Sequence, residues 1–168
     1  MKKFLTIAAG LAFVAGLSTQ AQAQTCTTAG CTVSHTVSAT APTVLNLTLS
    51  SVTTTLSNPT ATDFEVAAGL DNAGPTVTLK SNKSASVTIS TAAANWTGPV
   101  GTTKSIGDLR WRISGGGPGA ALTGSGADVI AAGKGSRSEN ITWNTYWDLD
   151  TDEPGAYSLA AVFTLVSP

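Results

Sequence analysis

The residues of this chain that could do chemistry are few and scattered. His35 is the single histidine, and it lies between Val33 and Val37. A Ser–His–Asp hydrolase would have to use this histidine. The sequence, however, has no Gly-x-Ser-x-Gly elbow and no His-Glu-x-x-His motif. We therefore expect no catalytic residue and a protein that is not an enzyme, with a hydrolase that uses His35 as the least favoured alternative.

An acidic cluster runs from Asp148 to Glu153. Asp148, Asp150 and Asp152 alternate along the chain, as carboxylates do at the start of a calcium loop. The rest of the cluster departs from that pattern, because Glu153 stands where such a loop has glycine and Leu159 where it has a bidentate glutamate. We favour a solvated turn here. A weak calcium site at the three aspartates is the alternative, and no other metal or cofactor is expected.

The aromatic residues divide by their position in alternating segments. Trp111, Trp143 and Trp147 share the parity of apolar neighbours and are expected in the core. Trp96 follows the end of a strand pattern, and Tyr146 points away from the neighbouring tryptophans. Trp96 and Tyr146 are therefore the two candidates for an exposed ligand contact, for example with a carbohydrate. For Trp96 we favour a ring folded over the end of the sandwich.

Cys26 and Cys31 are the only cysteines. Two thiols in an exported chain usually pair, which predicts a short disulfide loop. A metal site is the rival interpretation, but two sulfurs and His35 fall short of the four ligands that a structural zinc ion takes.

The first 23 residues have the pattern of a secretory signal. Lys2 and Lys3 precede the apolar run Phe4–Leu17, and Ala21–Ala23 matches a cleavage site. We expect cleavage after Ala23, with an uncleaved anchor as the alternative. Residues 24–168 are then expected to form a single exported domain in the periplasm, at the cell surface or outside the cell.

The charge of the mature chain argues against nucleic-acid binding. Without Lys2 and Lys3, seven basic residues face ten acidic ones, and no basic cluster survives. No second apolar run is long enough to span a membrane.

Composition and periodicity predict an all-β fold for the mature domain. Serine and threonine make up about a quarter of the chain, and apolar residues alternate in short segments separated by turn formers. Residues 77–80 and 86–90 are expected to form a hairpin, and residues 115–138 a long loop with one short strand. The expected strands fall near residues 33–37, 45–49, 52–56, 64–66, 77–80, 86–90, 109–113, 129–131, 141–147 and 156–166. The segments near 33–37, 52–56 and 129–131 have the weakest pattern, so we expect seven to nine strands in all, the number typical of an immunoglobulin-like Greek-key sandwich.

The best-defined motif is Asp152-Glu153-Pro154-Gly155-Ala156-Tyr157. Pro154 and Gly155 fit the centre of a type II turn, and Tyr157 opens the last apolar strand. A tyrosine at this place is typical of a tyrosine corner, whose hydroxyl binds backbone a few residues upstream.

Two stretches of this sequence resemble bacterial surface β-sandwiches. These are Val77–Ile89 and the corner with its closing strand at 152–166. The chain is similar there to fimbrial subunits, spore-coat-protein-U-like adhesin domains and WxL-like wall-binding domains. The resemblance implies a non-catalytic structural or adhesive surface protein, whose partner is a protein or a glycan, with self-association through a sheet edge. A carbohydrate-binding module that uses Trp96 and Tyr146 is the alternative function.

Overall fold

The computed structural model describes residues 25–65 and 69–168. The predicted signal at 1–23 and the predicted strand residue Val66 lie outside this part of the chain. Two compact units divide the chain, one up to Thr40 and one from Ala41 to Pro168. Every strand of the described residues lies in the second unit. The single domain predicted at 24–168 stays a prediction.

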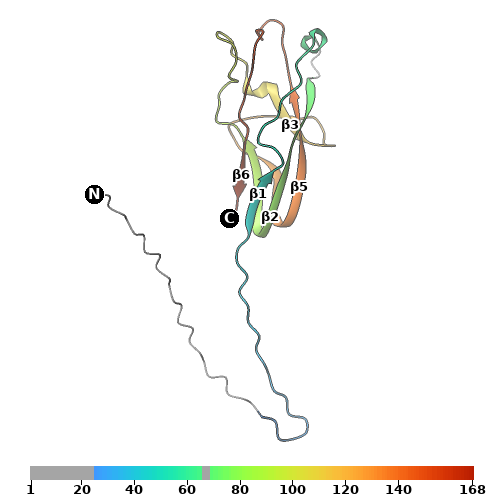
Figure 1. Ribbon diagram of the computed structural model, residues 1–168, viewed down its shortest axis with the longest axis vertical. Helices are drawn as coiled ribbons and strands as arrows, with labels where there is room; N and C mark the ends of the chain where they lie inside the picture. Colours follow the sequence, from blue (N-terminus) through green and yellow to red (C-terminus); the bar gives the residue numbers. More distant parts are fainter. Residues whose placement is uncertain (1–24, 66–68) are drawn as a thin grey trace, which may run out of the picture. The chain divides into compact units, whose positions relative to one another are not determined.

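The regular secondary structure of the second unit is almost wholly antiparallel strand (Figure 1). Two short 3-10 helices, η1 (Ala61–Phe64) and η2 (Ile106–Asp108), are the helical elements of the described residues. The strands are β1 (Leu45–Leu49), β2 (Leu70–Ser90), β3 (Leu109–Ile113), β4 (Ala120–Ala121), β5 (Ala127–Thr145) and β6 (Val162–Val166). The order along the sheet is β1-β2-β5-β3-β4, with β6 on β2. The predicted all-β class is confirmed.

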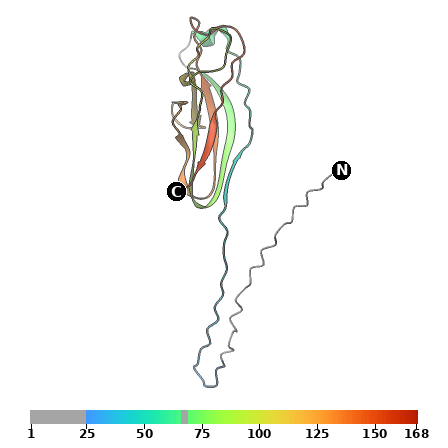
Figure 2. The same cartoon turned by 90° about the vertical axis from the view of Figure 1, so that its left-hand side faces the viewer.

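The two long strands β2 and β5 are paired along almost their whole length, and both reverse direction at the same bend. Figures 1 and 2 show this paired ribbon descending in one layer and rising in the other. The bend in β2 falls where the register shifts between Ser81 and Ala85, and that in β5 falls near Gly133–Gly135. Each long strand thus supplies one arm to each layer of a sandwich. If the two arms of β2 and the two arms of β5 are counted separately, the six strands become eight, which lies within the predicted range of seven to nine.

The side chain of Arg137 stabilises the bend by hydrogen bonds to the backbone. Its guanidinium donates hydrogen bonds to the backbone carbonyls of Ala85 at 2.8 Å and Gly133 at 2.7 Å, and also to that of Ala131. A planar guanidinium has enough donors to satisfy several carbonyls at once. The side chain therefore binds carbonyls that the sharp bend removes from the regular ladder.

The core lies between the two layers. Val77 and Leu79 come from one arm of β2, Val87 and Ile89 from the other, and all four are buried. Each pair keeps the period of two, because successive side chains of a strand point to opposite faces. The core is completed by Ala85, Trp96, Leu109, Trp111, Leu122, Val129, Ile130, Ile141 and Trp143. Trp111 and Trp143 are thus core residues, as predicted.

Several predicted local pairings are wrong. Residues 77–80 and 86–90 are not a hairpin, because Leu79 is paired with Arg137 and Val87 with Ile130 and Leu165. The polar residues 82–84 do reverse the direction of the chain. The two arms of β2 on either side of them, however, lie in different layers and face each other with their side chains instead of their backbone edges. Phe64 lies in η1 instead of a strand, and residues 33–37 and 52–56 form none.

The predicted long loop at 115–138 is also wrong. It contains β4, and β5 begins already at Ala127. Its glycines do not prevent strand pairing, because Gly133 and Gly135 sit at the bend, where Ala85 and Ser81 are their partners. Trp147 lies beyond the end of β5 and is only half-buried, so the prediction that it belongs to the core is wrong.

The closing strand is shorter than predicted. Residues 162–166 pair with β2, whereas residues 157–161 make only the isolated bridge between Ser158 and Thr97. The reason is that β2 ends at Ser90, which leaves no ladder for the preceding residues. The predicted alternation still holds, since Tyr157, Leu159, Ala161, Phe163 and Leu165 are all half-buried and their neighbours exposed.

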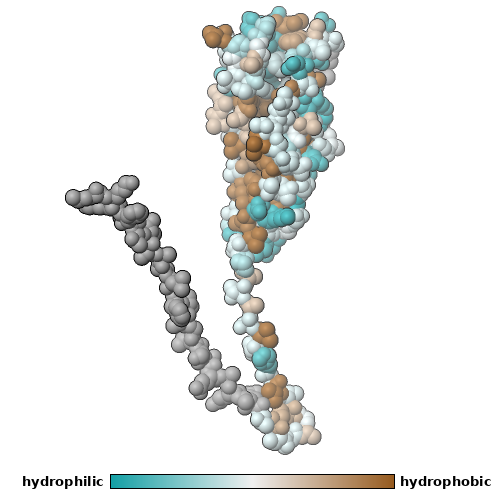
Figure 3. Space-filling model, viewed as in Figure 1, coloured by the Kyte–Doolittle hydropathy of each residue, from teal (hydrophilic) through white to brown (hydrophobic). Residues whose placement is uncertain are grey.

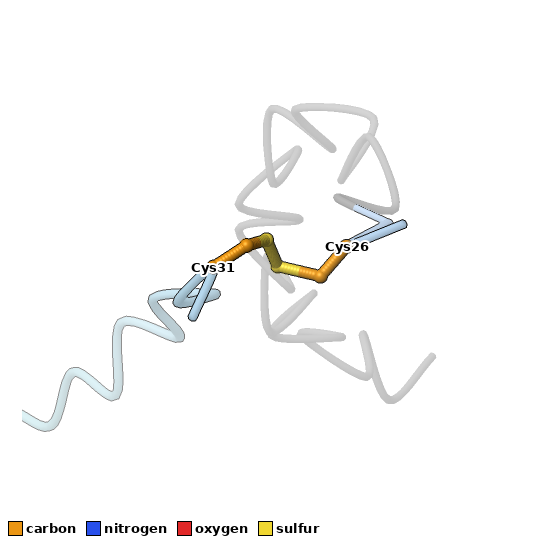
Figure 4. Close-up of a disulfide and its surroundings, with 2 residues drawn as sticks. All are labelled: Cys26 and Cys31. Carbon is orange, nitrogen blue, oxygen red and sulfur yellow. A yellow bond between two sulfur atoms is a disulfide. The ribbon is translucent and has the colours of Figure 1, made fainter. Parts of the chain in front are cut away.

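The first unit contains the predicted disulfide. Cys26 and Cys31 are joined with their Cα atoms 5.8 Å apart (Figure 4). The residues that follow, 32–39, have no regular secondary structure and are all exposed.

Candidate functional site

The sandwich is open along one side, between β1 and β6. The β2 strand uses one edge for β5 along both arms, and its other edge pairs with β1 at Val77–Ser81 and with β6 at Ser86–Ser90. Within the described residues, β1 and β6 each have a strand partner on one side only. Both therefore point unpaired N–H and C=O groups outward from every second residue.

A groove of about 1340 Å³ runs along this open side. Segment 51–59, which continues β1, forms one wall, and segment 153–161, which leads into β6, forms the other. Leu49 and Phe163 mark the places where β1 and β6 enter it. Figure 3 shows an apolar stripe along the same face, over β1 and β6. A groove that continues from two unpaired strand edges is of the kind that can take an added strand.

The floor of the groove is aromatic. Trp96, Trp143 and Trp147 line it together with Leu109. The indole nitrogens of Trp96 and Trp147 are buried and have no hydrogen-bond acceptor in the described part of the chain. Buried indole N–H groups usually find a partner, so these two donors are unsatisfied in the isolated chain.

One end of the groove is closed by an aromatic cluster. The ring of Trp147 packs edge-on against Tyr157 with centroids 5.4 Å apart, and against Phe64 at 6.0 Å. Tyr157 is held in turn by its hydroxyl, which donates to the carbonyl of Glu153 at 2.7 Å. This is the corner contact that the sequence predicts.

The turn before Tyr157 differs from the predicted type II form. Gly155 has a φ of +154°, far from the value of about +80° that a type II turn has at this position. A side chain here would also strike a neighbour, because a Cβ on Gly155 would lie 2.4 Å from Cγ of Pro99. Gly155 is required by this close packing.

A buried ion pair lies beside the aromatic cluster. The Lys104 Nζ donates to Oδ2 of Asp152 and to the carbonyl of Tyr146, each at 2.6 Å. It also lies 4.4 Å from the ring centroid of Trp147 and 3.8 Å from Oδ2 of Asp108. Burial raises the pKa of Asp108, an effect that the nearby Lys104 only partly offsets.

The acidic loop is organised by its own backbone. The Asp148 N–H donates to Asp152 Oδ2 at 3.0 Å, and the Asp150 N–H donates to Asp148 Oδ1 at 2.7 Å. Over residues 25–65 and 69–168, no group of three or more His, Cys, Asp and Glu side chains is placed so that it could hold a metal ion. Calcium binding at Asp148, Asp150 and Asp152 stays a prediction.

The two predicted ligand contacts have different surroundings. Trp96 is only 7% exposed and belongs to the core, which agrees with the favoured interpretation of a tryptophan folded over the end of the sandwich and leaves little of it for a ligand contact. Tyr146 is half-buried, with the guanidinium carbon of Arg110 4.6 Å from its ring centroid. A ligand contact at Tyr146 stays a prediction.

The sequence singled out His35, which does not line the groove, and it did not single out Lys104, which contacts two of the lining residues, Asp152 and Trp147. His35 lies in the exposed segment 32–39, outside the β-domain unit. Lys104 was not singled out, because a lone lysine carries no local signal. Residues 52–56 were predicted as a strand and not as part of a site. Only the folded chain brings Lys104 to Asp152, 48 residues away.

Comparisons with known proteins give little beyond the fold. No family model matches the chain, and no curated protein matches it. A solved chain from a chaperone–usher pilus structure is similar at 13% identity with a TM-score of 0.45, over 87% of this chain and all of that one. This likeness is too distant to bear on function. No helix in the described residues is long and apolar enough to cross a membrane.

Proposed function

We infer that this protein is a non-catalytic structural protein of the cell surface that associates with further copies of itself by strand addition. The observation that carries this proposal is the open side of the sandwich. There the edge strands β1 and β6 lead into segments 51–59 and 153–161, which form the walls of a groove of about 1340 Å³ with an aromatic floor. Exposed edges of this kind are normally blunted or covered, because they invite pairing with another chain.

The groove has the chemistry of a site for an extended apolar segment. Leu47, Leu49, Leu159, Ala161 and Phe163 turn toward the core from the two flanking segments, yet all remain half-exposed. A strand laid between β1 and β6 would cover them with every second side chain and would bind the free backbone groups with its own.

The occupant that fits is segment 32–39 of a second copy. Its Val33, His35, Val37 and Ala39 alternate with serine and threonine, so one face is mainly apolar. Val33 and Val37 are 52% and 83% exposed, and the segment has no strand partner. Insertion would bury these valines, and burying apolar surface stabilises association by roughly 25 cal/mol per Å² before its costs.

The test is the concentration dependence of assembly, measured by sedimentation velocity on the mature chain. The parent protein is expected to form higher oligomers as its concentration rises. The double variant Val33→Asp with Val37→Asp puts charges on the apolar face of the inserted segment, and Ala161→Asp puts a charge into the groove. Each variant is therefore expected to stay monomeric. Thr164→Asp, on the outward face of β6, is the matched control and should assemble like the parent.

Mixing the two defective variants separates this mechanism from others. The groove variant still has an intact segment 32–39, and the segment variant still has an intact groove. An equimolar mixture should therefore give a dimer that does not grow further. A parent protein that remains a monomer at every concentration, or a mixture that stays monomeric while each variant is folded, contradicts the proposal.

A further inference from the structure

Lys104 and Asp152 form an ion pair that is almost completely withdrawn from water. Their side chains are 2% and 3% exposed, and Nζ lies 2.6 Å from Oδ2. A buried ion pair is costly to desolvate, because each charge loses its contact with water. Transfer of one proton from the ammonium to the carboxylate would leave an amine in contact with a carboxylic acid.

The surroundings of the pair orient both groups. The Tyr146 carbonyl accepts from Nζ at 2.6 Å, and the Asp148 N–H donates to Asp152 Oδ2 at 3.0 Å. The ring of Trp147 covers the lysine head from another side. A nucleophile and an electrophile held in contact in a dry site react far faster than the same groups free in water.

A third group that can carry protons lies within reach. Oδ2 of Asp108 is 3.8 Å from Nζ. Asp108 is the third residue of η2, a turn held by the Asp108 N–H bond to the Ser105 carbonyl at 3.1 Å. Its raised pKa, caused mainly by burial, favours the acid form of its carboxyl.

We propose that Lys104 and Asp152 condense into an amide cross-link, with Asp108 transferring the protons. Nζ of the neutral amine attacks Cγ of the Asp152 carboxylic acid, and the carbon–nitrogen bond forms. Asp108 takes the surplus proton from nitrogen and gives a proton to the departing hydroxyl. The carbon–oxygen bond breaks, and one water leaves. The reaction needs no oxidant and no other co-reactant.

The cross-link would tie the segment before η2 to the acidic loop before segment 153–161. It closes a loop of 48 residues that contains β3, β4 and β5. A covalent bond at this place would hold the end of the groove against pulling, whether or not strand addition occurs. This inference does not rest on the proposed function.

The decisive measurement is the intact mass of the folded, secreted chain after denaturation and reduction of its disulfide. We expect the parent protein to be lighter than its sequence by the mass of one water. Digestion with trypsin should leave the bond after Lys104 uncut and yield a branched peptide that joins Lys104 to Asp152. A folded parent protein with its full sequence mass overturns the proposal. So does a lost water that maps to a cyclic imide within one peptide.

Three variants test the roles of the residues. Lys104→Arg keeps the positive charge but has no amine, and Asp108→Asn keeps the size of the side chain but cannot carry the protons. Both are expected to show the full mass while circular dichroism reports a folded β-protein. Asp150→Asn, in the same loop, is the matched control and should keep the deficit. A deficit that persists in folded Lys104→Arg rules out the cross-link, and one that persists in Asp108→Asn rules out the role of Asp108.

Discussion

The hydroxyl of Tyr157 donates a hydrogen bond to the backbone carbonyl of Glu153 at 2.7 Å, while its ring packs edge-on against Trp147 with centroids 5.4 Å apart. One side chain thus joins the corner backbone to the aromatic end of the groove. The hydroxyl contact and the ring contact can be separated by substitution.

We expect Tyr157→Phe to destabilise the protein by about 1 kcal/mol, since it removes one neutral hydrogen bond and keeps the ring. Tyr157→Ala should cost about 3 kcal/mol or more, because it also removes a large packed side chain. Urea unfolding followed by tryptophan fluorescence measures both. Tyr146→Phe is the control for loss of a hydroxyl; an equal loss of stability there would contradict a special role for the corner.

Gly155 is predicted to be intolerant of even a methyl group. Gly155→Ala would place a Cβ 2.4 Å from Cγ of Pro99 and force a φ of +154° on an L-residue. We expect a loss of about 2 kcal/mol in the free energy of unfolding. Gly117 has open space around its Cα and no positive φ, so Gly117→Ala should be near neutral. Equal effects at the two positions would show that the contact with Pro99 is unimportant.

Arg137 is predicted to be a principal stabiliser of the bent β2–β5 ribbon. Arg137→Met keeps much of the aliphatic stem but leaves the carbonyls of Ala85 and Gly133 without their donor. We expect a loss of about 3 kcal/mol by thermal unfolding. Arg137→Lys should recover only part of it, because an ammonium cannot reproduce the fork. Lys134→Met, at the exposed tip of the same bend, is the control and should change stability by less than about 0.5 kcal/mol.

The dependence of stability on pH is predicted to include a contribution from Asp71. Hydrogen bonds from the side chain of Asn144 and from Arg112 lower its pKa below the ordinary 3.8. The folded state therefore binds this proton more weakly than the unfolded state does. The resulting stability is complete above the unfolded pKa and is lost as the pH falls through the folded one.

The measurement is denaturant unfolding of the parent protein and of Asp71→Asn at several pH values. The parent should be the more stable at pH 7, and the difference should vanish in strong acid. Because the pair with Arg112 is partly exposed, added salt should reduce the difference at neutral pH. A difference that is constant across pH would exclude Asp71 ionisation as its source.

Local pattern predicted which face of each strand is buried, but it did not predict the partners of the strands. Leu79 and Val87 each point inward as their parity requires, and the polar run between them does reverse the chain. The alternation of inward and outward side chains is the same, however, whether two segments pair as a hairpin or lie in different layers. The long β5 strand decides between them by pairing with both arms, and its glycines at 133 and 135 sit at the common bend.

The candidate site was predictable only in part, for the same reason. Tyr157 belongs to a local motif, and its contact partner Glu153 lies only four residues earlier in the chain. The contact between Lys104 and Asp152 spans 48 residues and involves two residues with no distinctive neighbours. Trp96 follows the end of a strand pattern, where parity no longer applies, so the sequence left an exposed contact open beside the favoured buried position.

The sequence by itself determined the class of the fold, the inward faces of its strands and the corner at Tyr157, and it favoured the pairing of Cys26 with Cys31. All of these depend on alternation, composition or contacts between near neighbours. Tertiary structure alone decided that β2 and β5 fold over together and that β1 and β6 keep open edges. It alone brought Lys104 into contact with Asp152. Those features depend on which distant segments pair, and the period of two in a strand contains no information about the neighbour it will meet.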